Sequence, residues 1–156
     1  MIALDVPGFG ALRLAHLVCD FNGTLACDGR LVRGVQERLV ALARVIDVHV
    51  VTADTFGTAR SALARVPCSM DLIGTTNQSA AKAVRIRKWG ARSVIAVGNG
   101  RNDRGMLRAA ALSIAVCGPE GAAGDAYSAA DVFVPAIVDA LDLLRLPNRL
   151  IATLRS

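Results

Sequence analysis

Residues 17–25 read Leu-Val-Cys-Asp-Phe-Asn-Gly-Thr-Leu, an apolar run that ends abruptly in a carboxylate and an Asn-Gly-Thr turn. The apolar part predicts a buried β-strand. A carboxylate at the end of such a strand is seldom found unless it is paired, bound to a metal or used in chemistry. In an open α/β sheet, ligands bind at the carboxyl ends of the strands. Asp20 is therefore a candidate functional residue, although an ordinary strand-to-turn exit is the alternative, because Asn-Gly is a common turn pair.

The length and composition indicate one globular domain. The chain has 156 residues, 53% of them apolar, which is enough for one compact domain with a sizeable core and excludes a disordered chain. We therefore expect a single domain over residues 1–156. No apolar run approaches the length of a membrane span, and Asp5, Pro7 and Gly8 interrupt the N-terminal segment too early for a signal peptide. The expected location is the cytoplasm.

The net charge bears on nucleic-acid binding, and the cysteines bear on the redox compartment. A formal net charge of +5 could indicate a nucleic-acid surface, but the basic residues are spread along the chain and aromatic residues make up only 4%. A basic nucleic-acid-binding module is therefore kept only as a third alternative. The cysteines are scattered without paired metal-ligand spacing, so we interpret them as free thiols in a reducing compartment. They are Cys19, Cys27, Cys68 and Cys117.

Strand and helix patterns alternate along the chain. Apolar strand patterns lie at residues 17–19, 48–51, 70–73, 93–97, 112–116 and 132–134. Helical patterns lie at 34–46, 56–65, 78–89 and 103–110, and a final helical region begins at Pro135 and is interrupted at Pro147. Strands separated by helices of this length imply right-handed crossovers and a mostly parallel sheet. We predict an α/β fold of the Rossmann-like type, with the sheet sandwiched by helices.

Two short hairpins are also predicted. Residues 2–5 and 11–14 flank a Pro-Gly turn, which predicts an N-terminal β-hairpin at an edge of the sheet, where Pro7 is tolerated. The pair Asp28-Gly29 lies between short apolar pieces and predicts a second hairpin over residues 26–32, called the flap below.

Three of the predicted strands are followed by polar clusters. These are Asp20 with Asn22, Thr52 with Asp54, and Gly98-Asn99-Gly100-Arg101-Asn102-Asp103. Parallel strands would bring all three clusters to the same edge of the sheet. Each feature alone has a simpler interpretation, because Thr52 could be a helix cap and Lys82 a solvated helix residue. The order of carboxylate, hydroxyl, lysine and second carboxylate is what indicates a functional site.

These motifs resemble those of the haloacid dehalogenase-like (HAD) superfamily of aspartyl-phosphate phosphotransferases. Residues 20–25 resemble the first motif, Asp-x-Asp-Gly-Thr, and Thr52-Ala53-Asp54 is close to the Thr-Gly-Asp of P-type ATPases. Lys82 fits the third motif, and residues 98–103 resemble the fourth, Gly-Asp-Gly-x-Asn-Asp. The resemblance covers residues 17–134 and is nearest to soluble proteins similar to the phosphorylation domain of P-type ATPases.

The resemblance implies a role for each matching residue. Asp20 would be the nucleophile that accepts the phosphoryl group and a ligand of Mg²⁺, and the backbone carbonyl of Asn22 would be a second ligand. Thr52 and Lys82 would hold the phosphoryl oxygens, with Lys82 as a compact cation. Asp103 would complete the Mg²⁺ site, directly or through water, because Mg²⁺ prefers hard oxygen ligands and few carboxylates.

The remaining motif residues are expected around the phosphate and the metal. By the resemblance, Gly23, Thr24, Ala53 and Asn102 would contact the phosphate, and Asn99 would lie at the metal. Gly23 allows a tight turn that presents backbone amides, and Thr24 adds a hydroxyl beside them.

Two residues depart from the family pattern. The usual second aspartate of the first motif, a general acid and base, is Asn22, and the first aspartate of the fourth motif is Asn99. An amide does not shuttle a proton at neutral pH, and a positioned acid-base group typically contributes roughly 10²–10⁴-fold. We therefore expect slow hydrolysis and weak metal binding. The alternative is a catalytically weak or inactive domain that senses phosphate or nucleotide, or mediates protein interaction.

The spacing of the motifs leaves no room for a cap domain. Only the flap and one helix fit between the first two motifs, and only one helix and one strand fit before Lys82. The expected protein is thus a capless phosphatase or phosphotransferase, active on a phosphorylated small molecule or macromolecule. An open site is exposed to water, so we also expect a homo-oligomer with its interface near residues 26–32. Nucleic acid and membrane partners are not expected.

Overall fold

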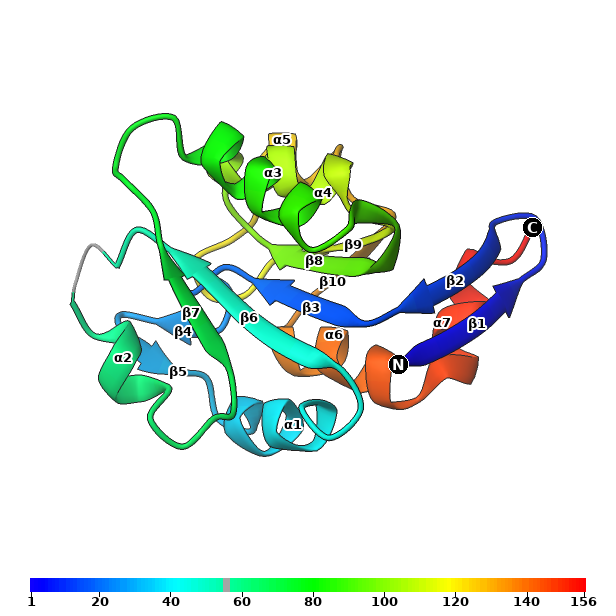
Figure 1. Cartoon of the computed structure of the whole chain (residues 1–156), viewed down its shortest axis with the longest axis horizontal. Helices are drawn as coiled ribbons and strands as arrows, with labels where there is room; N and C mark the ends of the chain where they lie inside the picture. The colour runs from blue at the N-terminus through cyan, green and yellow to red at the C-terminus, as the bar shows by residue number, and fades with distance from the viewer. Residues whose placement is uncertain (55–56) are drawn as a thin grey trace.

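The computed structural model describes residues 1–54 and 57–156, and its centre is a six-stranded sheet in the order β10-β9-β8-β3-β6-β7 (Figure 1). Every neighbouring pair in this sheet is parallel. The strands are β3 (His16–Cys19), β6 (Asp47–Thr52), β7 (Ser69–Leu72), β8 (Val94–Gly98), β9 (Leu112–Val116) and β10 (Val132–Val134). The predicted parallel sheet is therefore confirmed.

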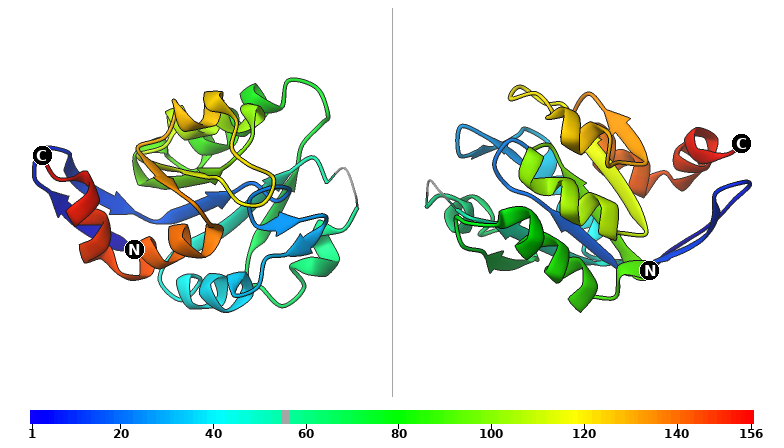
Figure 2. Two further views of the ribbon diagram at one scale, coloured as in Figure 1. Left: turned by 180° about the vertical axis from the view of Figure 1, so that it is seen from behind. Right: turned by 90° about the horizontal axis from the view of Figure 1, so that it is seen from above.

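Helices cover both faces of this sheet (Figures 1 and 2). One face carries α3 (Gln78–Lys88), α4 (Arg104–Ala109) and α5 (Gly124–Tyr127). The other carries α1 (Val35–Leu42), α2 (Ala59–Ala62) and α6 (Ile137–Arg145). Short 3₁₀ turns at Ala91–Ser93 and Arg101–Asp103 precede β8 and α4. The predicted Rossmann-like sandwich is the observed architecture.

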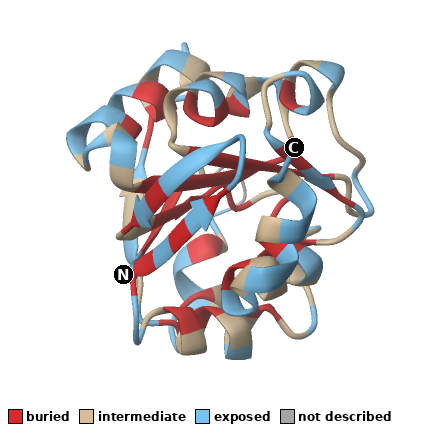
Figure 3. Cartoon of the chain, turned by 90° about the vertical axis from the view of Figure 1, so that its right-hand side faces the viewer, coloured by how far each residue is buried: buried red, intermediate tan, exposed pale blue. Residues whose placement is uncertain are grey.

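The strands at the centre of the sheet are largely buried (Figure 3), and the last three residues of β3 are completely so. Leu17 and Cys19 lie in the apolar cluster beneath α1 and α6, and Val18 lies in the cluster beneath α3 and α4. Successive side chains of a strand point to opposite faces, so a short run of apolar residues can serve both layers. This explains why β3 reads as a continuous apolar run.

The N-terminal hairpin forms, but its predicted place was wrong. Strands β1 (Ile2–Val6) and β2 (Gly10–Leu14) make a separate two-stranded antiparallel sheet, and the edges of the main sheet are β7 and β10. Only Ala15 separates β2 from β3, so the hairpin extends beyond the sheet rather than beside an edge strand. It packs against α7 (Pro147–Leu154) at the C-terminus.

Several helices differ in length from their predicted spans. The helix predicted over 34–46 ends at Leu42, although Ile46 is still buried. The helix predicted over 56–65 is only α2; its predicted first residue lies outside the described residues, and Gly57 has a φ of +64° that a helix does not accept. Pro147 divides the last helical region because proline is accommodated in the first helical turn, where it begins α7.

The flap is present as predicted. Strand β4 (Ala26–Cys27) pairs with β5 (Arg30–Leu31), and both turn residues, Asp28 and Gly29, have positive φ. An Asp-Gly pair is well suited to such a turn. Over the described residues, the chain inserts only this flap before α1 and only α2 between β6 and β7, so the HAD-like fold is capless.

Two findings bear on the expected absence of a membrane span and on the expected free cysteines. The longest helix, α3, has 11 residues, and no helix within 1–54 and 57–156 is long and apolar enough to cross a bilayer. All four cysteines are free thiols, as predicted.

The close packing of α3 on α4 depends on Gly105. A Cβ atom at this position would lie 2.5 Å from the backbone oxygen of Ser79, and the Gly105 amide donates to the Ser79 hydroxyl at 3.1 Å. We predict that Gly105→Ala lowers the free energy of unfolding by about 1–3 kcal/mol, although alanine favours helices. Urea denaturation measures this difference.

Gly124→Ala is the matched control, because it lies in α5 and no atom lies within 4 Å of its added Cβ. We expect it to be neutral or slightly stabilising. Equal stability of the Gly105→Ala protein and the wild type would contradict this account of helix packing.

Candidate active site

The three polar clusters converge at the carboxyl ends of the parallel strands. They follow β3, β6 and β8, and β3 lies between the other two. In the parallel register, Cys19 pairs with Val50 on one side and with Val97 on the other. The Asp20 amide then donates to the carbonyl oxygen of Val97 at 3.0 Å. Asp20, Thr52 and the segment after β8 therefore leave the sheet at the same level, as the sequence predicts.

Lys82 joins two of these clusters. Its Nζ atom donates to Asp20 Oδ1 and to Asp103 Oδ1, each at 2.6 Å. Lys82 lies on α3 and is 1% exposed, so it is not a solvated helix residue. A lysine is almost never fully buried unless it is paired, and here it has two carboxylate partners.

A tight turn holds Asp103. Its Oδ2 atom accepts hydrogen bonds from the backbone amides of Asn99 at 2.9 Å and Gly100 at 2.8 Å. A Cβ atom at Gly98 would lie 2.6 Å from Asp103 Cγ, so glycine is required where the turn begins. Both carboxylate oxygens of Asp103 thus have partners, and the residue is completely buried.

The site contains more negative than positive charge. Burial and the charge of Asp103 raise the pKa of Asp20 to about 7, against the opposing effect of Lys82. Burial lowers the pKa of Lys82, but the attraction of Asp20 and Asp103 outweighs it, so this pKa is raised and the ammonium remains charged. With both carboxylates ionised, one buried negative charge is not compensated by these three groups.

Thr52 is buried at the end of β6 and is not a helix cap. Its Oγ1 atom accepts a hydrogen bond from the Asp54 amide at 3.0 Å. Asp54, two residues further on, accepts a hydrogen bond at its Oδ1 from the amide of Ala59, the first residue of α2. Ala53, between them, is half-buried. The Thr52 hydroxyl can still donate its own hydrogen to a ligand.

Thr24 and Asn99 connect the first motif to the fourth. Thr24 Oγ1 donates to Asn99 Oδ1 at 3.1 Å, and Asn99 Nδ2 donates to the carbonyl of Gly121 at 3.0 Å. Gly23 has a φ of +79°, and a Cβ there would lie 2.5 Å from Asn99 Nδ2. Asn22, half-buried, forms an isolated bridge with Ala26 at the base of the flap. The side-chain amide of Asn99 thus connects the loop after β3 with the loop after β9 through these two hydrogen bonds.

Asn102 lies on the other side of the fourth motif. Its Nδ2 donates to Gln78 Oε1 at 2.6 Å, at the start of α3. It lines a surface hollow together with Thr75, Asn77, Gln78, Ser79, Arg101 and Arg104. A contact between Asn102 and a phosphate stays a prediction.

Glu120 was missed by sequence analysis. It lies in the loop after β9, and its Oε2 would be 2.9 Å from a Cβ atom at Gly23. Ligand atoms of Cys27, Asp28 and Glu120 all lie within 4.8 Å of one another, between this loop and the flap. The available signal was a carboxylate in a turn that follows a strand of the same parallel sheet.

Comparison with known sequences identifies relatives of this chain. No protein-family model matches the chain. The uncharacterized protein MJ0073 of Methanocaldococcus jannaschii is 48% identical over 64 residues, which are 41% of this chain and 69% of that protein. The chain belongs to the family of MJ0073.

Solved structures of HAD phosphatases share the fold. Cobalt-bound deoxy-D-mannose-octulosonate 8-phosphate phosphatase from Haemophilus influenzae has a TM-score of 0.70 at 14% identity, over 86% of this chain and 88% of that one. The corresponding enzyme from Moraxella catarrhalis, in complex with magnesium, phosphate and KDO, has a TM-score of 0.67 at 18% identity and coverages of 91% and 94%. A phospho-aspartyl intermediate analogue of phosphoserine phosphatase has a TM-score of 0.66 at 15% identity and coverages of 86% and 99%. The chain therefore has the HAD-like fold.

The raised pKa of Asp20 makes a prediction about stability. Because the folded-state pKa of about 7 exceeds the ordinary value of 3.8, the stabilising contribution of this group is full below pH 4 and is lost as the pH rises through 7. In chelator-treated protein at pH 8, we predict that Asp20→Asn raises the free energy of unfolding by about 1–4 kcal/mol.

The difference between the two proteins should shrink as the pH falls and nearly vanish below about pH 4, where Asp20 is protonated in both the folded and the unfolded protein and resembles asparagine. Asp5→Asn is the control, because Asp5 is exposed and, among the described residues, forms its ion pair with Arg13 at the surface. Denaturant unfolding at pH 8 and below about pH 4 measures the difference. A less stable Asp20→Asn protein at pH 8 would count against the assigned charge balance.

Proposed function

We propose that this protein is a Mg²⁺-dependent phosphohydrolase that forms an aspartyl-phosphate on Asp20. The observation that carries the proposal is the contact of one buried ammonium, Lys82, with two buried carboxylates, Asp20 and Asp103, at the carboxyl edge of a parallel sheet. Buried groups of this kind at a strand edge are more typical of a reaction centre than of a packing core. The similarity in fold to phosphatases, one of them a phospho-aspartyl analogue, supports the same reaction class.

The residues present fit a Mg²⁺ ion. The carboxylates of Asp20 and Asp103 exceed the charge of Lys82 by one, which a divalent cation would offset. Mg²⁺ is commonly held by one or two carboxylates with water and substrate phosphate. Asp20 and the backbone carbonyl of Asn22 would bind it directly. Asp103, whose oxygens already accept three hydrogen bonds, would bind it through water. Bound Mg²⁺ would neutralise and orient the phosphoryl oxygens.

In the first half-reaction, a carboxylate oxygen of Asp20 attacks phosphorus while the bond to the leaving group breaks. The ammonium of Lys82 and the hydroxyl of Thr52 stabilise the charge on the phosphoryl oxygens, which is the main requirement of phosphoryl transfer. Water then attacks the aspartyl-phosphate, releases phosphate and regenerates Asp20. Because Asp103 also accepts a hydrogen bond from Lys82, the ammonium keeps one fixed partner through both steps.

Asn22 limits the rate. A carboxylic acid at this position would protonate the leaving group and then accept the proton of the attacking water, but an amide does neither at neutral pH. The leaving group must take its proton from solvent, so acyl phosphates and activated aryl phosphates should be better substrates than alkyl monoesters. The same residue, together with Asn99, favours a second candidate function, a phosphate-sensing domain without turnover.

We predict that Asn22→Asp raises the turnover of phosphate monoesters by roughly tenfold or more, because it supplies the missing acid-base group at nearly constant volume. The gain should be smallest for acyl phosphates, which do not need a protonated leaving group. Steady-state kinetics at saturating Mg²⁺, across the pH range, measure both effects.

The same substitution in an Asp20→Asn background is the control and should restore nothing, because the nucleophile is absent. Mg²⁺ binding to the Asn22→Asp protein is measured in parallel. If that protein binds Mg²⁺ and gains no activity on any monoester, the sensing function is favoured over the phosphohydrolase.

A further inference from the structure

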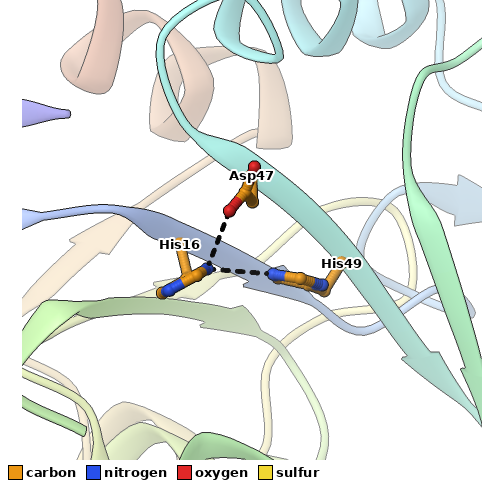
Figure 4. A group of neighbouring side chains, drawn as sticks. All are labelled: His16, Asp47 and His49. Carbon is orange, nitrogen blue, oxygen red and sulfur yellow. Dashed lines mark hydrogen bonds and ion pairs between the residues drawn. The ribbon is translucent and has the colours of Figure 1, made fainter. Parts of the chain in front are cut away.

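A second group of ligating side chains lies at the opposite end of the central strands (Figure 4). His16 is the first residue of β3, and Asp47 is the first residue of β6, with His49 two residues further on. Asp20, by contrast, follows the last residue of β3. At about 3.3 Å per residue, His16 and Asp20 are roughly 13 Å apart along the strand. This group is therefore separate from the candidate active site.

The register of the sheet brings the three side chains to one face. His16 and Asp47 are direct partners in the β3–β6 pairing, and residues two apart on a strand point the same way. The face is the one beneath α3, because the ring of Trp89, at the end of that helix, stacks on His49 at 4.1 Å.

The distances within the group suit a metal centre. His16 Nδ1 lies 3.2 Å from His49 Nε2 and 3.4 Å from Asp47 Oδ2, and all three ligand atoms lie within 4.8 Å of one another. Bonds of 2.0–2.1 Å in a tetrahedral zinc site place neighbouring ligand atoms about 3.3–3.4 Å apart. The two separations that involve His16 Nδ1 are thus already those that a tetrahedral ion requires, and Asp47 and His49 offer ligand atoms within 4.8 Å of each other.

Ser69 and Trp89 set the orientation of the His49 ring. Its Nδ1 lies 2.6 Å from the hydroxyl of Ser69 on β7, and Trp89 holds the plane of the ring. When Nδ1 donates its hydrogen to that hydroxyl, Nε2 presents a lone pair to His16 and Asp47. Metal-ligating histidines commonly have such a partner on the second ring nitrogen.

The position also provides access. His49 is buried, but the His16 side chain is 21% exposed and the Asp47 side chain is 74% exposed. A surface hollow lined by Asp47, His49, Cys68 and Ser69 opens beside them. An ion could enter from solvent and keep a water molecule as its fourth ligand.

We propose that His16, Asp47 and His49 form a binding site for one Zn²⁺ ion. Two imidazoles and one carboxylate are a ligand set that zinc uses and that Mg²⁺ does not favour. The ion would join the first residues of β3 and β6, at the amino ends of these strands, whereas Asp20 follows the carboxyl end of β3. The site therefore does not depend on the proposed phosphohydrolase activity.

The test uses metal-free full-length protein. Titration calorimetry with Zn²⁺, in the presence of excess Mg²⁺ to saturate the oxygen ligands near Asp20, should show one Zn²⁺ bound per chain. We expect His16→Asn and Asp47→Asn to weaken this binding by about tenfold or more, because each removes a ligand while leaving a partly exposed position that folding tolerates. Asp5→Asn, an exposed carboxylate with one ion-pair partner, should bind Zn²⁺ like the wild type.

Co²⁺ gives an independent readout, because a four-coordinate Co²⁺ site with imidazole ligands absorbs visible light far more strongly than a six-coordinate oxygen site. The absorption should appear in the wild type and in Asp20→Asn and be lost in Asp47→Asn. Zn²⁺ should also raise the midpoint of thermal unfolding of the wild type and of Asp20→Asn. Undiminished Zn²⁺ affinity in His16→Asn and Asp47→Asn, or binding that disappears in Asp20→Asn, would overturn the proposal.

Discussion

One buried ammonium between two buried carboxylates is the interaction on which the candidate active site depends. Asp20 is presented by β3, Asp103 by the turn after β8, and Lys82 by α3, so the contact joins the central strands to the helical layer above them. A buried ion pair of this kind contributes little net stability, and here the two carboxylates carry one charge more than the single ammonium offsets. Such an arrangement is more typical of a reaction centre than of a packing core.

The sequence predicted the parts of the site that depend on local pattern. An apolar strand followed directly by Asp20 is visible without any knowledge of the fold, and the Asp28-Gly29 turn depends only on two adjacent residues. The parallel sheet followed from the alternation of strands and helices. Parallel pairing implied that the polar residues after three strands would meet, and the hydrogen bonds of Lys82 to Asp20 and Asp103 agree with it.

What the sequence did not predict depends on contacts between distant segments. The N-terminal hairpin lies beyond the sheet because α7, at the other end of the chain, covers it. The contact of Glu120 with the Gly23 loop arises only when the loop after β9 folds back. The pairing of His16 with His49, 33 residues apart, is created by the register of β3 and β6 and by Trp89. No local pattern encodes these arrangements.

The central claim is that Asp20 carries the phosphoryl group during turnover. The most direct measurement is to incubate the protein with Mg²⁺ and an acyl phosphate, quench it in acid, and locate the modification by peptide mass spectrometry. In the proposed mechanism Asn22 slows the hydrolysis of the aspartyl-phosphate, so the account predicts that phosphate accumulates on Asp20, is released by hydroxylamine, and is absent from the Asp20→Asn protein. Hydrolysis of the acyl phosphate without any label on Asp20, or with the label on another residue, would contradict it.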